Sequence, residues 1–144
     1  MGAMRAPRFA GVHLFVRDMG KALAFYRRLG ISFPADAEKG VHAAAEVGDG
    51  VDLAFGTFAL TRGYDPGFRE PKGGPTNCLQ FHVESRADVD RIHDDLVAAR
   101  YTSHLAPHDA FWGARYAEIE DPDGNIVGFQ SPRDPRKHSS PPGL

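Results

Sequence analysis

Four polar residues on separate expected strands have side chains that could bind a divalent cation: His13, Asp52, His82 and Gln130. Imidazole nitrogens and carboxylate or amide oxygens are ligands that such ions accept in proteins. A metal site would require these side chains to converge within about 2.0–2.2 Å of one ion. The alternative is that the four groups line a wet pocket and form hydrogen bonds with a ligand or with water.

Trp112 is the only tryptophan of the chain and lies between Phe111 and Gly113. At the mouth of a strand, such a side chain either packs on the core as a rim aromatic or stacks against a flat ligand. Arg115 follows on the same expected strand and could add a charge or a cation–π contact. We expect Trp112 and Arg115 to contribute to a ligand-binding site.

Other residues with reactive or metal-binding side chains fit structural roles better. His104 and His108 flank a proline in an expected loop, so they are expected to be surface histidines. Asp121 and Asp123 belong to a turn, where an aspartate bonds to its own backbone. Cys78 is expected to be a buried, inert strand cysteine.

An internal repeat positions these residues. The turn Asp121-Pro122-Asp123-Gly124 leads into an apolar strand, and Asp49-Gly50 leads into a similar one. Asp18 and Ser85 are each expected to cap a helix that follows a strand. The expected elements are strands over 9–16, 31–37, 41–47 and 50–58 with a helix over 19–29, then strands over 78–83, 101–106, 112–120 and 125–130 with a helix over 86–99. This order predicts an α+β fold made of two βαβββ modules.

The composition of the connecting segments predicts the domain boundaries. Glycine and proline are frequent between residues 61 and 76, which indicates a linker. The polar, proline-rich end of the chain is expected to be disordered. The predicted organisation is a flexible N-terminus 1–8, module 1 over 9–60, the linker 61–76, module 2 over 77–131 and a flexible tail 132–144.

The overall composition excludes several classes of protein. The 144 residues are 42% hydrophobic and 25% charged, and the net charge of −2 includes no basic stripe for nucleic acid. One cysteine excludes an intrachain disulfide framework. No apolar run approaches the roughly 20 residues of a membrane span, and no signal peptide is recognisable, so we expect a cytoplasmic protein.

Three short motifs resemble the vicinal oxygen chelate superfamily, which includes glyoxalase I, extradiol dioxygenases and bleomycin-resistance proteins. They are Val16-Arg17-Asp18, Ala24-Phe25-Tyr26 and Glu120-Asp121-Pro122-Asp123-Gly124. The resemblance covers nearly all of residues 9–131 and implies paired modules whose mixed sheets curl around a ligand. Phe25 to Ile31, Cys78-Leu79 and Trp112-Gly113 are most similar to the bleomycin-resistance type of binding protein.

Metal-dependent members of that superfamily resemble one another in four ligand positions, which fall here on Gly11, Ala54, Cys78 and Gly128. Three of these residues have no side-chain ligand atom, and one thiol cannot hold a catalytic metal alone. The resemblance therefore implies a cup without a metal or other cofactor. Its expected ligand-binding residues are His13, Phe15, Asp52, Phe55, Gln80, His82, Trp112 and Arg115.

The resemblance implies a homodimeric protein that sequesters an antibiotic or a related flat ligand, such as a bleomycin-like compound, without breaking a bond. The alternative is a metal-dependent lyase, isomerase or dioxygenase whose metal is displaced to His13, Asp52, His82 and Gln130. A third possibility is a module that binds a metabolite for a partner protein. Whether the two modules pair within one chain or between subunits stays open.

Overall fold

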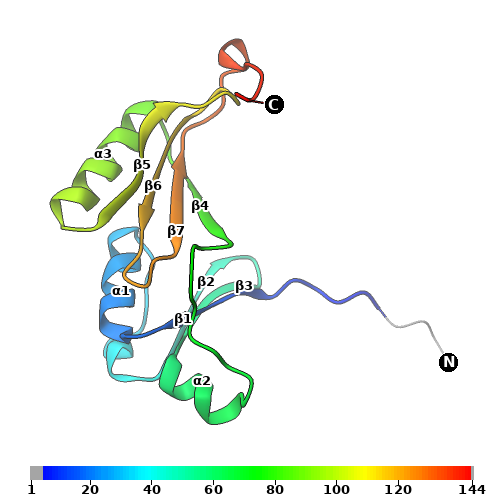
Figure 1. Ribbon diagram of the computed structural model, residues 1–144, viewed down its shortest axis with the longest axis vertical. Coiled ribbons are helices and arrows are strands. Elements are labelled where there is room, and N and C mark those ends of the chain that lie inside the picture. The colour runs from blue at the N-terminus through cyan, green and yellow to red at the C-terminus, as the bar shows by residue number, and fades with distance from the viewer. Residues whose placement is uncertain (1–4, 144) are drawn as a thin grey trace. The chain divides into compact units, whose positions relative to one another are not determined.

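A computed structural model describes residues 5–143 of the chain, in two compact units, Met1–Lys72 and Gly73–Leu144 (Figure 1). Unit 1 contains β1 (Gly11–Val16), α1 (Met19–Arg28), a 3-10 turn at Ala37–Lys39, β2 (His42–Gly48), β3 (Val51–Thr57) and α2 (Phe58–Tyr64). Unit 2 contains β4 (Cys78–His82), α3 (Arg86–Ala98), β5 (Thr102–Asp109), β6 (Arg115–Glu120), β7 (Ile126–Gln130) and a 3-10 turn at Pro135–Lys137.

Each unit has one mixed sheet, and the two sheets share a pattern. The strand orders are β1-β3-β2 and β4-β7-β6-β5, with the first pair parallel and the others antiparallel. His13 lies opposite Ala54 in unit 1, and Gln80 lies opposite Gly128 in unit 2. Equivalent residues of the sequence repeat therefore occupy equivalent positions, and the predicted α+β fold with mixed sheets is confirmed.

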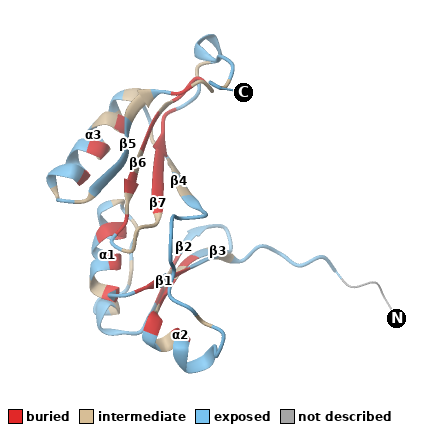
Figure 2. Cartoon of the chain, in the orientation of Figure 1, coloured by how far each residue is buried: buried red, intermediate tan, exposed pale blue. Residues whose placement is uncertain are grey.

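The two long helices begin where the sequence predicts. The Asp18 carboxylate accepts a hydrogen bond from the Lys21 amide at 2.9 Å, and the Ser85 hydroxyl accepts one from the Asp88 amide at 3.2 Å. Gly30 ends α1 with φ of 88°, a conformation that glycine adopts without strain. Most of the buried residues lie on the three helices and on β1, β2, β3, β6 and β7 (Figure 2). Within residues 5–143, no helix is long and apolar enough to cross a membrane.

Unit 1 lacks the strand predicted over residues 31–37. In its place Asp36 adopts a left-handed conformation and the 3-10 turn follows. Pro34 has no amide hydrogen for a strand ladder, and its carbonyl accepts a bond from the Arg27 guanidinium at 3.3 Å. Phe33 packs against Phe55 with ring centroids 5.5 Å apart, so this segment covers the core as a loop.

Three further segments differ from the sequence-based expectation. The start of the expected linker 61–76 belongs to α2, which the Thr57 hydroxyl caps by accepting from the Leu60 amide at 3.1 Å. The strand expected over 112–120 begins only at Arg115. Residues of the expected flexible tail 132–144 carry the second 3-10 turn, and the Ser139 amide donates to the Phe111 carbonyl at 2.7 Å. Of the expected flexible N-terminus 1–8, residues 1–4 lie outside the described residues, and 5–8 are exposed without regular secondary structure.

The turn before β7 is built on the buried Asp121. Its carboxylate accepts from the Asp123 amide, the Asn125 amide and the Asn125 side chain, each at 2.9 Å. Gly124 closes the turn with φ of 84°. This arrangement confirms the structural role predicted for Asp121.

Replacing Asp121 by alanine should lower the free energy of unfolding by about 2–3 kcal/mol, because hydrogen bonds to a charged acceptor contribute roughly 1.5–3 kcal/mol. Urea denaturation would measure the change. Asp49→Ala is the matched control: Asp49 is exposed in the corresponding turn of unit 1, and its replacement should change stability by less than about 0.5 kcal/mol. Equal losses in the two variants would contradict this role of Asp121.

Candidate functional site

The strand register of unit 2 collects polar side chains on one face of its sheet. Tyr116 lies opposite Gln130, and Glu118 lies opposite Gly128. On the other side of β7, Gln80 lies opposite Gly128 and His82 opposite Gln130. Because side chains alternate along a strand, these residues share a face. We call it the polar face of unit 2, formed by Cys78, Gln80, His82, Tyr116, Glu118 and Gln130.

The Tyr116 hydroxyl occupies the space beside Gly128. A Cβ atom on Gly128 would lie 2.3 Å from this hydroxyl oxygen, so no larger residue fits without displacing Tyr116. The hydroxyl donates to a Glu118 carboxylate oxygen at 2.8 Å and lies 3.7 Å from the Cys78 sulfur. Burial and then the Glu118 contact raise the pKa of Tyr116 above its ordinary range, so this residue is a neutral phenol.

Cys78 is an exposed residue, which corrects the expectation of a buried cysteine. Partial desolvation of its sulfur raises the pKa of the thiol, and the nearby Glu118 carboxylate acts in the same direction. A thiol with a raised pKa is a poor nucleophile at neutral pH.

Trp112 lies at the edge of the polar face, in the loop before β6. Its indole N–H donates to the Gln130 amide oxygen at 3.1 Å. Its ring meets the Tyr116 and Phe111 rings edge-on, with both centroid distances 5.1 Å. Trp112 therefore forms a half-buried aromatic wall beside Gln130, and a stacking contact with a ligand stays a prediction.

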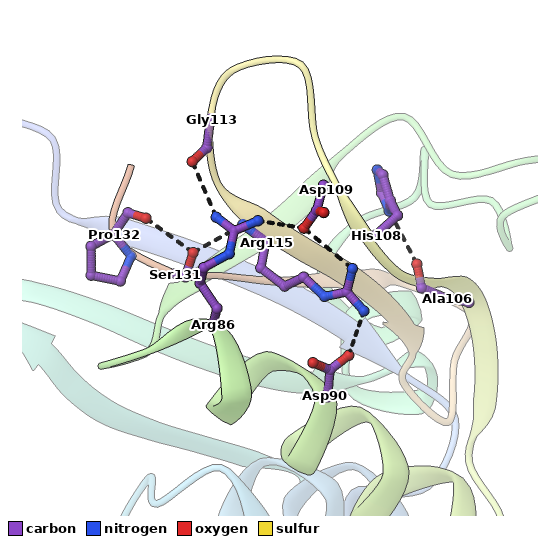
Figure 3. Close-up of polar contacts among 9 residues, drawn as sticks. All are labelled: Arg86, Asp90, Ala106, His108, Asp109, Gly113, Arg115, Ser131 and Pro132. Atoms are coloured by element: carbon purple, nitrogen blue, oxygen red, sulfur yellow. Dashed lines mark hydrogen bonds and ion pairs between the residues drawn. The ribbon is translucent and has the colours of Figure 1, made fainter. Parts of the chain in front are cut away.

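Arg115 lies on the opposite face from the one that sequence analysis assigned to it. Its guanidinium donates to Asp90 of α3 at 2.8 Å and to Asp109 of β5 at 3.3 Å (Figure 3). Arg86 also bonds to Asp109 and donates to the Gly113 carbonyl at 3.3 Å. This network joins α3 to the loop that carries Trp112. In the sequence, nothing distinguishes Asp90 and Asp109 from ordinary surface carboxylates.

His13, Phe15 and His42 gather on one face of the unit 1 sheet. The His13 ring lies 5.7 Å from the His42 ring, nearly parallel to it, and 5.2 Å from the Phe15 ring. Gly56 makes room for this arrangement, because a Cβ atom there would lie 2.7 Å from His13 Cε1. Phe15 also contacts Phe68, from the segment after α2, at a centroid distance of 5.4 Å.

The other two predicted residues of unit 1 have different surroundings. Phe55 is fully buried and packs against Tyr26 of α1 with ring centroids 5.1 Å apart, so it belongs to the core and not to the face of His13. The alternation of β3 explains this, since Ala54 lies opposite His13 and Phe55 is its neighbour. Asp52 is exposed and lies opposite Gly11.

The four ligand positions implied by the family resemblance do not fit a divalent metal. A Cβ atom on Gly11 would lie 2.1 Å from the Asp52 carbonyl oxygen, and Ala54 has no ligand atom. Gly128 also lacks a ligand atom and is covered by Tyr116, so Cys78 is the only one of the four positions that offers a ligand atom. Among residues 5–143, no group of three or more histidine, cysteine, aspartate or glutamate residues could hold a metal ion.

The displaced metal site expected as an alternative draws on both units. His13 and Asp52 belong to unit 1, whereas His82 and Gln130 belong to unit 2. The Gln130 amide oxygen, which is the ligand atom that this site would need, already accepts the Trp112 N–H. Unit 2 therefore supplies His82 and a Gln130 oxygen that already accepts one hydrogen bond.

The class of protein follows from these features: a duplicated α+β chain in which each unit presents polar or aromatic side chains on one face of a mixed sheet. The model of the Glyoxalase/Bleomycin resistance protein/Dioxygenase superfamily matches residues 8–129. The chain therefore belongs to this superfamily.

Solved structures of low sequence identity share the fold. A glyoxalase/bleomycin resistance protein/dioxygenase family enzyme from Burkholderia phytofirmans is 20% identical, with a TM-score of 0.73 over 85% of this chain and 96% of that one. A glyoxalase/bleomycin resistance protein/dioxygenase from Nocardioides is 23% identical, with a TM-score of 0.71 over 99% and 91%. A lactoylglutathione lyase from Agrobacterium tumefaciens is 20% identical, with a TM-score of 0.63 over 89% and 96%. A search of curated proteins found no significant match.

Gly128→Ala should lower the free energy of unfolding by about 1–3 kcal/mol, because the added methyl group overlaps the Tyr116 hydroxyl. Adding Tyr116→Leu should restore part of this stability by vacating the space. Gly63→Ala is the control, since nothing lies within 4 Å of its Cβ position and alanine favours a helix. Thermal or urea denaturation that shows no loss for Gly128→Ala would contradict the placement of Tyr116.

Stability should also fall as the pH drops through 6.5, the ordinary pKa of histidine. Burial, and then the proximity of His42, lower the pKa of folded His13, so the unfolded chain binds more protons in the range just below 6.5. His42→Gln should raise the His13 pKa towards 6.5, as followed by the imidazole resonances in an NMR titration. A His13 pKa at or above 6.5 in the unaltered protein would contradict the arrangement.

Proposed function

We propose that this protein binds a small, flat organic molecule on the polar face of unit 2, without a metal ion and without breaking a bond. The observation that carries this proposal is the Tyr116 hydroxyl beside Gly128. A neutral phenol occupies the space where the resemblance implies a metal ligand, and its proton is committed to Glu118.

The surroundings of Tyr116 suit a flat ligand. Trp112 forms a wall at one edge, and the His108 ring lies 6.1 Å from the Tyr116 ring. Exposed Gln80 and His82 offer polar groups on the adjacent strand. Aromatic rings contribute contact area, and a few polar groups orient the ligand, which is the usual composition of a small-molecule site.

Capture of an antibiotic is the biological role that this site supports best. The family to which the chain belongs includes bleomycin resistance proteins, and stoichiometric capture requires a binding surface but no catalytic group. We include in this proposal that the protein acts as a homodimer, which sedimentation velocity would distinguish from a monomer.

Isothermal titration with bleomycin and with proflavine, a flat cationic dye, should detect binding of at least one compound that is unchanged by EDTA. Trp112→Ala should weaken this binding roughly 2- to 10-fold, the effect of losing one aromatic contact. Tyr64→Ala removes an exposed aromatic residue of unit 1 and serves as the control, with no expected change.

Two results would contradict the proposal. Loss of binding in EDTA, with recovery on adding Zn²⁺, Mn²⁺ or Ni²⁺, would indicate the metal-dependent alternative. Equal affinities of the unaltered protein and of Trp112→Ala would show that the ligand binds elsewhere.

A further inference from the structure

The side chain of Gln130 is held in one orientation by Trp112. An indole N–H is a hydrogen-bond donor only, so the group that faces it at 3.1 Å must be the amide oxygen. The NH₂ group of Gln130 therefore points away from Trp112. Gln130 as a whole is only 7% exposed, which makes this a directed, nearly buried donor.

Within residues 5–143, no side chain or carbonyl accepts a hydrogen bond from the Gln130 NH₂ group, whereas its oxygen is paired. Among the described residues, every fully buried side-chain nitrogen or oxygen has a hydrogen-bond partner. Because the Gln130 nitrogen has no partner within the chain, it must be accessible to solvent. Buried polar groups in proteins are nearly always paired with protein or with water. This accessible donor therefore pairs with water in the free protein and is available to a ligand that displaces that water.

The neighbours of Gln130 indicate the charge of that partner. The Glu118 carboxylate lies on the same face, within 2.8 Å of the Tyr116 hydroxyl and 3.8 Å from His104. A second negative charge on this face would be repelled by Glu118, whereas a neutral oxygen acceptor would not. Nearby, Gln80 can donate a further hydrogen bond from β4.

We propose that the Gln130 NH₂ group donates to a neutral carbonyl oxygen of the ligand, as found in an aromatic amide, lactam or ketone, while the ring of the ligand lies beside Trp112. This inference rests on the proposed function and adds to it the chemical class of the ligand. It also makes Gln130 the residue that selects for a carbonyl group.

Three naphthalene probes test this selectivity, because they share a ring and differ in one group: naphthalene-1-carboxamide is neutral, 1-naphthoate is an anion and 1-naphthylmethylammonium is a cation. Titrations followed by ¹H–¹⁵N NMR have a unique reporter in the single Trp112 indole N–H. The carboxamide should bind most tightly, and it should shift both this resonance and the Gln130 side-chain amide.

Gln130→Glu is the diagnostic variant, because it keeps an oxygen for the Trp112 N–H and removes both amide donors. Its affinity for the carboxamide should fall by about tenfold or more at pH 7.5, the loss expected when a buried hydrogen bond is removed. Asn77→Asp makes the same change from amide to carboxylate at an exposed position just before β4, and it should alter affinity less than about threefold. Gln130→Met provides a second test if the Glu variant does not fold.

Probes that all shift the Trp112 resonance with similar affinities, unaffected by Gln130→Glu, would overturn the carbonyl assignment and leave the proposed function standing. Failure of the carboxamide to shift either resonance would also overturn it. If bleomycin and proflavine give no binding either, the proposed function fails as well.

Discussion

The candidate site depends on one steric constraint, the close contact between Gly128 on β7 and the side chain of Tyr116 on β6. Because Gly128 has no side chain, the Tyr116 ring can lie across the sheet and bring its hydroxyl to Glu118. The same ring supports the edge of Trp112, which in turn orients Gln130. A larger residue at position 128 would displace Tyr116 and with it the chain of contacts that shapes the polar face.

The remainder of unit 2 holds these two strands and the Trp112 loop in place. Asp121 fixes the turn that sets the register between β6 and β7, and therefore the alignment of Tyr116 with Gln130. Arg86 and Arg115 share Asp109, so α3 restrains the loop from the opposite side of the sheet (Figure 3). Surface ion pairs of this kind contribute little stability individually, and their contribution here is to the position of the loop.

Local chemistry made much of the fold predictable from the sequence. Helix caps at Asp18 and Ser85, and the glycine turn at Gly124, depend on neighbouring residues and occur as expected. The strand expected over residues 31–37 was wrong because Pro34 cannot donate to a ladder and Phe33 packs into the core. The candidate site was harder to predict from the sequence, because it depends on contacts between strands that are distant along the chain. Strict alternation of side chains along each strand would have assigned Phe55 to the core and Arg115 to the face that packs against the helix. The contact between Tyr116 and Gly128 could be predicted only with knowledge of the register between β6 and β7.

In the sequence, three of the four metal positions of the family simply lack a side-chain ligand atom. In the structure the space at Gly128 is taken by a neutral phenol, and the space at Gly11 by a backbone carbonyl. The most direct test is anomalous diffraction from crystals soaked in Zn²⁺ or Mn²⁺, with data at the absorption edge of each metal. We expect no anomalous peak on the polar face of unit 2, and electron density for the Tyr116 hydroxyl beside Gly128. A peak within about 2.0–2.3 Å of Glu118 or Cys78, with Tyr116 displaced, would contradict it.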